Sequence, residues 1–278
     1  MKSIYDICAP AKLNLFLHIV GRRPDGYHLL ESVFMLVDWA DTLHFELRAD
    51  GQISREDLNT PLPPHDLIVR AAQALQLASG TPHGAHIGID KRIPAQAGMG
   101  GGSSDAASTL LALNRLWGLN LSLADLMTIG LKLGADVPFF LGGHNAWVTG
   151  IGEIMTPVEV PSARFVVVKP TQGLETQRIF SHPDLKRDTK SAILSGFAAN
   201  AFGYGQNDLQ GVAQQLCPEI CHALNWLNDL GLKGRMTGSG SAVFARMLHD
   251  VELGSAPGSF QVKLCSNLPA HPLQGWAV

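Results

Sequence analysis

The segment Gly98-Met99-Gly100-Gly101-Gly102-Ser103-Ser104-Asp105 stands between two patterned stretches of the chain. Before it, residues 86–93 alternate as a β-strand does, and after it apolar residues recur at helical spacing up to Gly118. Because glycine has no Cβ, the N–H groups of such a loop can converge on an anion, and a helix start adds the positive end of its dipole. The segment therefore predicts a phosphate-binding loop. The alternative is a flexible loop in which Ser103 or Ser104 only caps the helix.

Two common nucleotide-binding motifs do not account for this segment. The Walker pattern, which ends in Gly-Lys-Ser/Thr, is absent from the chain. A dinucleotide fingerprint can be fitted from Gly98 onward, but Ser103 occupies the place of its third glycine. We therefore expect a phosphate-binding loop of another type.

The rest of the chain alternates between strand and helix patterns without a regular order. Period-two alternation predicts strands at residues 13–20, with one face more buried, and at 43–47, and apolar runs predict buried strands at 165–169 and 242–245. Helices are expected at 67–77, from Ser122 (with Asp125 as a partial capping box) to Gly134, and in two pieces over 207–230 that break near Pro218. A tight turn is expected at 24–26 and a loop over the polar, proline-rich residues 50–64. This mixture favours the α+β class over a doubly wound sheet.

Composition limits the function classes. The chain has 278 residues, 46% of them hydrophobic and 16% charged, with a net charge of −3. This balance is typical of a soluble globular protein and argues against nucleic acid as a partner, since such binders carry a basic surplus. The sequence shows no membrane-spanning run and no secretory signal at its start, so we expect a cytoplasmic protein without a membrane partner.

Cys217 and Cys221 are four residues apart on a predicted helix, a spacing that could suit a metal ion. No second pair or histidine cluster completes such a site, and four cysteines in a chain of this size do not make a disulfide framework. Buried thiols are therefore the favoured interpretation.

Three segments together resemble a known family, the GHMP kinases, named after galactokinase, homoserine kinase, mevalonate kinase and phosphomevalonate kinase. Lys91-x-Ile93-Pro94 with residues 97–107 resembles the family's phosphate-binding motif. Residues 10–15, Pro-Ala-Lys-Leu-Asn-Leu, resemble its first motif, and residues 237–244, Thr-Gly-Ser-Gly-Ser-Ala-Val-Phe, resemble its third. The resemblance implies an ATP-dependent small-molecule kinase.

One branch of the family matches especially well. Its members phosphorylate a cytidine diphosphate-linked methylerythritol in the non-mevalonate isoprenoid pathway. Residues 23–28, Arg-Pro-Asp-Gly-Tyr-His, and residues 134–140, Gly-Ala-Asp-Val-Pro-Phe-Phe, are typical of this branch. The resemblance extends from about residue 10 to residue 244. It implies ATP-dependent transfer of a phosphoryl group to the 2-hydroxyl of the methylerythritol unit.

The resemblance also implies an α+β fold in two lobes. Residues 1–155 would form an ATP-binding and catalytic domain like ribosomal protein S5. Residues 156–278 would form a ferredoxin-like, substrate-binding domain. We expect a monomer or a weak homodimer.

By the same resemblance, Asp136 would be the catalytic base that takes the proton of the attacking hydroxyl, and it would also contact the substrate. Lys12 would lie beside it and compensate negative charge. Both roles suit phosphoryl transfer, which depends mainly on positioning and charge stabilisation. Without the resemblance, the alternatives are that Lys12 is a solvated lysine and that Asp136 caps residues 137–141.

The resemblance assigns the substrate's cytosine ring to Tyr27, by stacking, and to His28, by hydrogen bonds. Phe180 would be the second stacking partner, and Asn14 would bond the substrate as well. An aromatic pair is a sensible way to hold a flat base. The alternatives are an exposed aromatic residue beside a turn for Tyr27 and an ordinary core residue for Phe180.

For the nucleotide, the resemblance implies that the phosphates bind at residues 98–104. The adenine would lie near Lys91, Pro94, Asp66 and Leu67, although many relatives have Asn at the position of Asp66. Magnesium is expected because ATP is normally handled as its metal complex. No protein ligand is predicted for it; Ser104 is one candidate. Two other functions remain open, another GHMP small-molecule kinase and a non-catalytic nucleotide-binding regulator.

Overall fold

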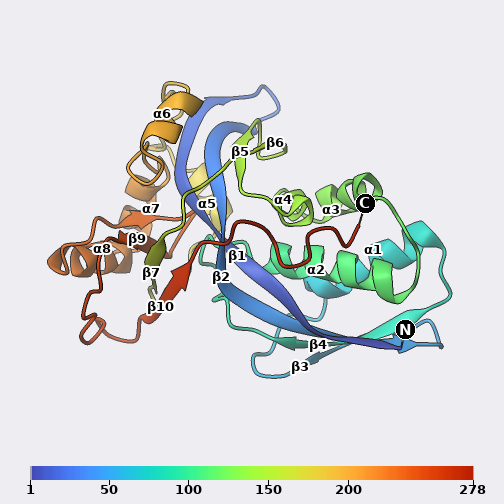
Figure 1. The fold of residues 1–278 in the computed structure, drawn as a ribbon. Coiled ribbons are helices and arrows are strands. Elements are labelled where there is room, and N and C mark those ends of the chain that lie inside the picture. Colours follow the sequence, from blue (N-terminus) through green and yellow to red (C-terminus); the bar gives the residue numbers. More distant parts are fainter. Residues whose placement is uncertain (1, 278) are drawn as a thin grey trace.

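The computed structural model describes residues 2–277, which form two sheets with helices packed on each (Figure 1). A long antiparallel hairpin connects the two halves of the molecule. Its strands are β1 (Ser3–Arg22) and β2 (His28–Arg48), and the predicted turn at residues 24–26 joins them. Gly26 has a φ of 91°, a conformation that favours glycine.

The prediction that β1 has one more buried face is wrong, because both faces are buried over most of its length. Ile7 and Ala9 belong to the core beneath the helices of the first half, whereas Leu17 and Ile19 belong to the core of the second half. The residues between them pack into a third core between the hairpin and the second sheet. A single strand therefore contributes to all three hydrophobic cores, and its centre lies where the two halves meet.

The first sheet has six strands, in the order β3-β4-β2-β5-β6, and β1 pairs with β2 outside this path. Its further strands are β3 (Ile53–Asp57), β4 (Gly84–Asp90), β5 (Ala146–Thr149) and β6 (Ile154–Pro157). The helices α1 (Leu67–Ser79), α2 (Gly101–Leu116), α3 (Leu123–Leu133) and α4 (Val137–Gly142) gather together on one side of the β1–β4 part of this sheet (Figure 1).

Strand β3 lies inside residues 50–64, so the prediction of a loop throughout that stretch is wrong. The strand pairs in parallel with β4 at the edge of the sheet. Its sequence, Ile-Ser-Arg-Glu-Asp, does not alternate between apolar and polar residues. Its polar side chains form ion pairs with local partners instead, such as Arg55 with Asp57 at 2.6 Å. An edge strand stabilised in this way leaves no periodic hydrophobic signal.

Helix α2 begins inside the glycine segment, at Gly101. Its N-cap residue is Gly100, in the left-handed conformation with a φ of 72°, and no side chain caps the helix. The alternative that Ser103 or Ser104 serves as the cap is therefore wrong. The predicted end at Gly118 and the Ser122–Asp125 capping box of α3 are both confirmed.

The second sheet has four strands, in the order β10-β7-β9-β8. They are β7 (Arg164–Lys169), β8 (Arg235–Met236), β9 (Val243–Met247) and β10 (Gln261–Ser266). The helices of this half are α5 (Thr176–Phe180), α6 (Leu194–Ala199), α7 (Gln210–Leu216) and α8 (Glu219–Asp229). The predicted break near Pro218 is confirmed, since α7 ends just before it. Over residues 2–277, none of the helices has the length and apolar character that a membrane crossing requires.

Candidate active site

A cleft of about 1000 Å³ lies between the two halves of the molecule. It is lined by most of the residues that the sequence singled out: Lys12, Asn14, Asp66, Leu67, Lys91, Pro94, Gly98, Met99, Gly100, Gly101, Gly102, Ser103, Asp136 and Phe180. Tyr27, His28 and Ser104 are not among the lining residues. Residues from both ends of the sequence, such as Lys12 and Gly238–Gly240, therefore face one cavity of a size that can hold a small ligand.

Lys12 and Asp136, which both line this cleft, form an ion pair. The Lys12 Nζ atom lies 3.7 Å from Asp136 Oδ2 and donates a hydrogen bond of 2.5 Å to Asn14 Oδ1. Asn14 is itself fixed, because its Nδ2 donates to Ser32 Oγ at 2.9 Å. Its backbone N–H donates to Thr237 Oγ1, also at 2.9 Å. The ammonium group is therefore held in place from two sides.

The two members of the pair differ in exposure. The side chain of Lys12 is 5% exposed and that of Asp136 is 31% exposed. Burial lowers the pKa of the Lys12 ammonium below its ordinary value, and the Asp136 carboxylate offsets this only in part. Asp136 thus provides a charged oxygen that a ligand can reach, with a fixed cation behind it.

Asp136 occupies the N-cap position of α4 but makes no capping hydrogen bond through its side chain. The alternative in which this aspartate serves as a helix cap is therefore wrong. Pro138 lies in the first turn of α4, where a proline is readily accommodated. The backbone places the carboxylate at the end of a short helix and leaves it free to face the cleft.

Two glycine-rich loops approach each other at the side of the cleft. A Cβ on Gly98 would lie 2.3 Å from the carbonyl oxygen of Thr237 and 2.8 Å from the nitrogen of Gly240. A Cβ on Gly238 would likewise lie 2.6 Å from the Gly98 carbonyl oxygen. Both residues also have positive φ. Backbone packs directly on backbone here, which only glycine allows. Residues 237–244 are thereby held against the glycine segment.

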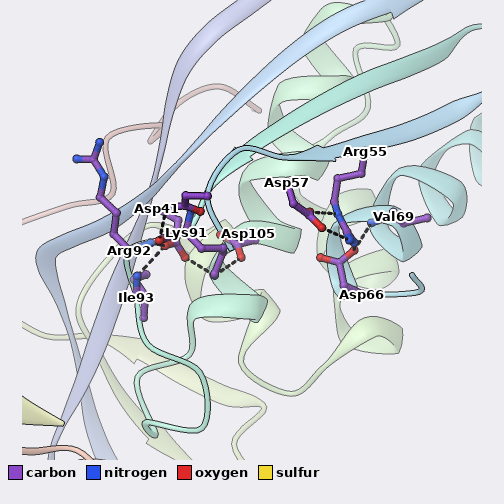
Figure 2. Close-up of polar contacts among 10 residues, drawn as sticks. Asp41, Arg55, Asp57, Asp66, Val69, Lys91, Arg92, Ile93 and Asp105 are labelled. Atoms are coloured by element: carbon purple, nitrogen blue, oxygen red, sulfur yellow. Dashed lines mark hydrogen bonds and ion pairs between the residues drawn. The ribbon is translucent and has the colours of Figure 1, made fainter. Parts of the chain in front are cut away.

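Lys91 lies in a buried cluster with two carboxylates. Its Nζ atom donates to Asp105 Oδ2 at 2.7 Å and to Asp41 Oδ2 (Figure 2). Asp41 is fully buried and also accepts from the backbone N–H groups of Arg92 and Ile93. Its carboxylate therefore fixes the turn that leads from β4 to the glycine segment.

The pKa values in this cluster follow from one cation shared by two acids. Burial by itself would lower the pKa of Lys91, but Asp105 and Asp41 together raise it above its ordinary value. Burial raises the pKa of Asp105, and Lys91 opposes this only in part. The charge of Lys91 is therefore already neutralised within the protein.

Asp66 is also engaged within the protein. It is the N-cap of α1, where Oδ1 accepts from the backbone N–H of Val69 at 3.1 Å, and it forms an ion pair of 2.6 Å with Arg55 (Figure 2). Its carboxylate thus has local partners, while the neighbouring Leu67 presents apolar surface to the cleft.

Of the three predicted base-binding residues, Phe180 lines the cleft, whereas Tyr27 and His28 do not. The rings of His28 and Phe180 are 5.1 Å apart with an interplanar angle of 39°. Tyr27 is 60% exposed, and within residues 2–277 its ring is paired with no other aromatic ring. The structure therefore brings His28 and Phe180 together and leaves Tyr27 apart from them.

Sequence reasoning missed three residues that hold the site together. Asp41 is a carboxylate inside an apolar strand, which is an unusual place for a charge. Arg187 donates to His28 Nε2 at 3.0 Å from a stretch without regular structure, so no pattern marks it. Asp105 follows directly on the glycines and serines of the glycine segment, but spacing did not identify Lys91 as its partner.

No group of three or more His, Cys, Asp or Glu side chains arranged to hold a metal ion is found among residues 2–277. Ser104 Oγ is fully buried and makes no hydrogen bond in the described structure. Its hydroxyl is therefore a buried polar group of the glycine segment whose hydrogen-bonding capacity is not used within the described residues.

Comparison with known proteins places this site in a family. The model of the GHMP kinase N-terminal domain matches residues 66–144, and that of the C-terminal domain matches residues 189–254. A 4-diphosphocytidyl-2-C-methyl-D-erythritol kinase of Albidiferax ferrireducens is 74% identical over all of this chain and 97% of its own length. One of Variovorax paradoxus is 64% identical over the full length of both chains.

Solved structures agree with these matches. A 4-(cytidine 5'-diphospho)-2C-methyl-D-erythritol kinase has a TM-score of 0.78 and 33% identity, covering 93% of this chain and 98% of its own. A homoserine kinase of Cytophaga hutchinsonii has a TM-score of 0.70 at 15% identity, covering 98% and 96%, and shares the fold alone.

The chain therefore belongs to the GHMP kinase family and, within it, to the 4-diphosphocytidyl-2-C-methyl-D-erythritol kinases. It is an ATP-dependent small-molecule kinase, and the predicted α+β fold in two lobes is confirmed.

Proposed function

We propose that the protein transfers the γ-phosphoryl group of ATP to the 2-hydroxyl of 4-diphosphocytidyl-2-C-methyl-D-erythritol, with Asp136 as the catalytic base. The relatives of matching length carry this kinase name. The observation that supports the site most directly is the Lys12–Asp136 pair, 3.7 Å apart in the same cleft as the glycine segment.

In the proposed reaction, a carboxylate oxygen of Asp136 accepts the proton of the 2-hydroxyl. The hydroxyl oxygen then bonds to the γ-phosphorus, the bond from that phosphorus to the bridging oxygen breaks, and ADP leaves. The partly exposed carboxylate of Asp136 is accessible to such a hydroxyl. It has to be within hydrogen-bond reach of the proton that it takes.

Lys12 supports this step through its charge. Its ammonium is buried, held by Asn14, and close to the carboxylate that gains the proton. A fixed cation in a site with little water stabilises negative charge on the transferring group more strongly than a solvated one would. Since the hydrogen bonds of Asn14 orient Lys12, we assign Asn14 a positioning role in addition to its predicted substrate contact.

The glycine segment would receive the phosphates of ATP. Gly100 and Gly101 start α2, so their backbone N–H groups and the helix dipole favour an anion at that end. Ser103 lines the cleft beside them. Leu67 and Pro94, on the same side, would contact the adenine, as the sequence predicts.

Magnesium, when bound, would shield the phosphate charges and polarise the γ-phosphoryl group. The described residues fit a metal ion that arrives with the nucleotide, because they include no preformed cluster of ligands. Ser104, whose buried hydroxyl makes no hydrogen bond among the described residues, is the candidate protein ligand, although it does not line the cleft.

The test is ADP release by the purified protein with ATP, magnesium and the cytidine substrate, alongside Asp136→Asn. Loss of the base is expected to lower kcat by about 10²–10⁴-fold. The matched control is Asp229→Asn, an exposed carboxamide substitution on α8 away from the cleft, which should retain wild-type kcat.

Two results would revise the proposal. Wild-type kcat in Asp136→Asn would remove this residue from the role of base. Absence of turnover with the cytidine substrate, together with activity on homoserine, mevalonate or galactose, would reject the substrate and keep only the family.

A further inference from the structure

Arg187 is held in place by residues 180–185, which include Phe180 of the cleft lining. One of its terminal nitrogens donates to the carbonyl oxygens of His182 at 2.8 Å and Phe180 at 3.3 Å. The other donates to those of Leu185 at 2.8 Å and Pro183 at 3.4 Å. All four hydrogens of the two terminal nitrogens therefore have acceptors within residues 180–185.

The fifth hydrogen of the guanidinium, on Nε, is directed at His28. Arg187 Nε lies 3.0 Å from His28 Nε2. Arginine has five N–H donors, no acceptor, and stays charged in proteins. His28 Nε2 must therefore accept this hydrogen bond through its lone pair, so the proton of the neutral imidazole resides on Nδ1.

The charges around His28 favour the same state. The titratable groups that face it are Arg187, from residues 180–190, and Arg22, at the end of β1, and both are cationic. The ring of Phe180, from α5, packs against it and carries no charge. Burial, Arg187 and Arg22 all lower the pKa of His28, so the imidazole remains neutral at physiological pH.

A neutral imidazole with its proton on Nδ1 presents one N–H donor on the ring edge that faces away from Arg187. The Watson–Crick edge of cytosine carries the N4 amino donor and two acceptors, N3 and O2, and an N–H on His28 is complementary to either acceptor. With the other tautomer, His28 would present a lone pair to these atoms, and two acceptors would face each other. The identity of the protonated nitrogen therefore decides which part of this edge His28 can bond: the acceptors N3 and O2, or the N4 amino group.

We propose that Arg187 is a positioning residue that fixes His28 in its Nδ1–H tautomer and so prepares it to donate to the acceptor edge of cytosine. This inference rests on the proposed function, because it takes the cytidine-bearing substrate as the ligand. Arg187 itself does not touch the base; it acts through His28 and through the carbonyl groups that hold residues 180–185.

The kinetic test compares Arg187→Met with Arg178→Met, an exposed arginine on α5 with no ion pair among the described residues. At pH 8, Arg187→Met should raise KM for the cytidine substrate about tenfold, as expected for one lost hydrogen bond, while kcat at saturation stays within about threefold. KM for ATP should not change, and Arg178→Met should behave as wild type. An unchanged KM for the cytidine substrate in Arg187→Met would overturn the proposal.

Acidification separates tautomer control from a merely structural role. Without Arg187, one of the causes that lower the pKa of His28 is gone, so His28 protonates at a higher pH than in the wild type, and the imidazolium always carries a proton on Nδ1. The KM defect of Arg187→Met should therefore shrink from about tenfold at pH 8 to within about threefold at pH 5.5. A defect of equal size at both pH values would mean that Arg187 only orders residues 180–185, and would also overturn the proposal.

A spectroscopic test needs neither variant nor turnover. In the full-length wild-type protein without ligand, the ¹⁵N chemical shifts of His28 should show a protonated Nδ1 and an unprotonated Nε2 across pH 6–8. A protonated Nε2 in the neutral ring would reject the inference directly. If the shifts agree but the protein does not turn over the cytidine substrate, the proposed function fails while the Arg187–His28 tautomer stands.

Discussion

Two lysines face the same cleft, Lys12 buried and Lys91 nearly so, and their surroundings differ. Lys12 has one carboxylate nearby, Asp136, at 3.7 Å and partly exposed. Lys91 has two, Asp41 and Asp105, both buried and in direct hydrogen-bond contact. The pKa of Lys12 is lowered by burial, whereas that of Lys91 is raised by its two acids.

This difference separates two uses of a buried cation. A lysine whose charge is fully matched within the protein holds elements together, because removing it leaves buried acids without a counter-charge. A lysine whose charge is incompletely matched retains attraction for an incoming anion. By this criterion we propose that Lys12 takes part in the chemistry and that Lys91 fixes the turn before the glycine segment.

The largest expected effect is on stability, in Lys91→Met. The substitution leaves the fully buried Asp41 without its cation, and breaking a buried pair in this way costs about 3–5 kcal/mol. Urea unfolding followed by circular dichroism would measure the loss. Lys132→Met, at an exposed position of α3, is the control and should change the free energy of unfolding by less than about 0.5 kcal/mol. Equal stability of the two variants would contradict the structural role of Lys91.

The next effect is on rate, in Lys12→Met. Removal of a preorganised charge at the reacting group is expected to lower kcat by about 10²–10³-fold. The free energy of unfolding should change much less than in Lys91→Met, because the remaining Asp136 is partly exposed to water. ADP release would measure kcat, and urea unfolding of the same preparation would measure the free energy of unfolding. A large loss of stability with nearly unchanged kcat would mean that Lys12, like Lys91, has a structural role, and would contradict the difference drawn between the two lysines.

The smallest expected effect is a pH dependence that originates in Asp105. The pKa of this carboxyl is raised in the folded state, so between its ordinary pKa of about 4 and the raised value the folded protein binds more protons than the unfolded chain. Stability therefore decreases as pH rises through that window.

Asp105→Asn removes this group and should flatten that part of the profile while leaving the Lys91–Asp41 pair in place. The measurement is the free energy of unfolding of wild type and variant at several values from pH 5 to pH 9. A wild-type stability that increases with pH over this range, beyond that of Asp105→Asn, would contradict the assigned direction.

Much of the fold was predictable from local patterns. The helix at α1, the capping box of α3 and the break near Pro218 are each determined by neighbouring residues, so the sequence alone indicates them. Strand β3 was not predictable, because its polar side chains are satisfied by ion pairs such as Arg55 with Asp57 rather than by a hydrophobic face. Burial of β1 on both faces was missed as well, since it depends on packing from two separate halves of the chain.

The candidate site divides in the same way. The sequence by itself determined the candidates for a phosphate site and its chemistry, namely the glycine segment, Lys12 and Asp136, because closely spaced residue types and the family resemblance both point to them. Only the tertiary structure decided which charged side chains are already paired within the protein. Asp41 and Asp105 come from different elements and meet Lys91 across 50 and 14 residues of sequence, and Arg187 meets His28 across 159. Such contacts depend on how distant elements pack, and no local pattern contains that information.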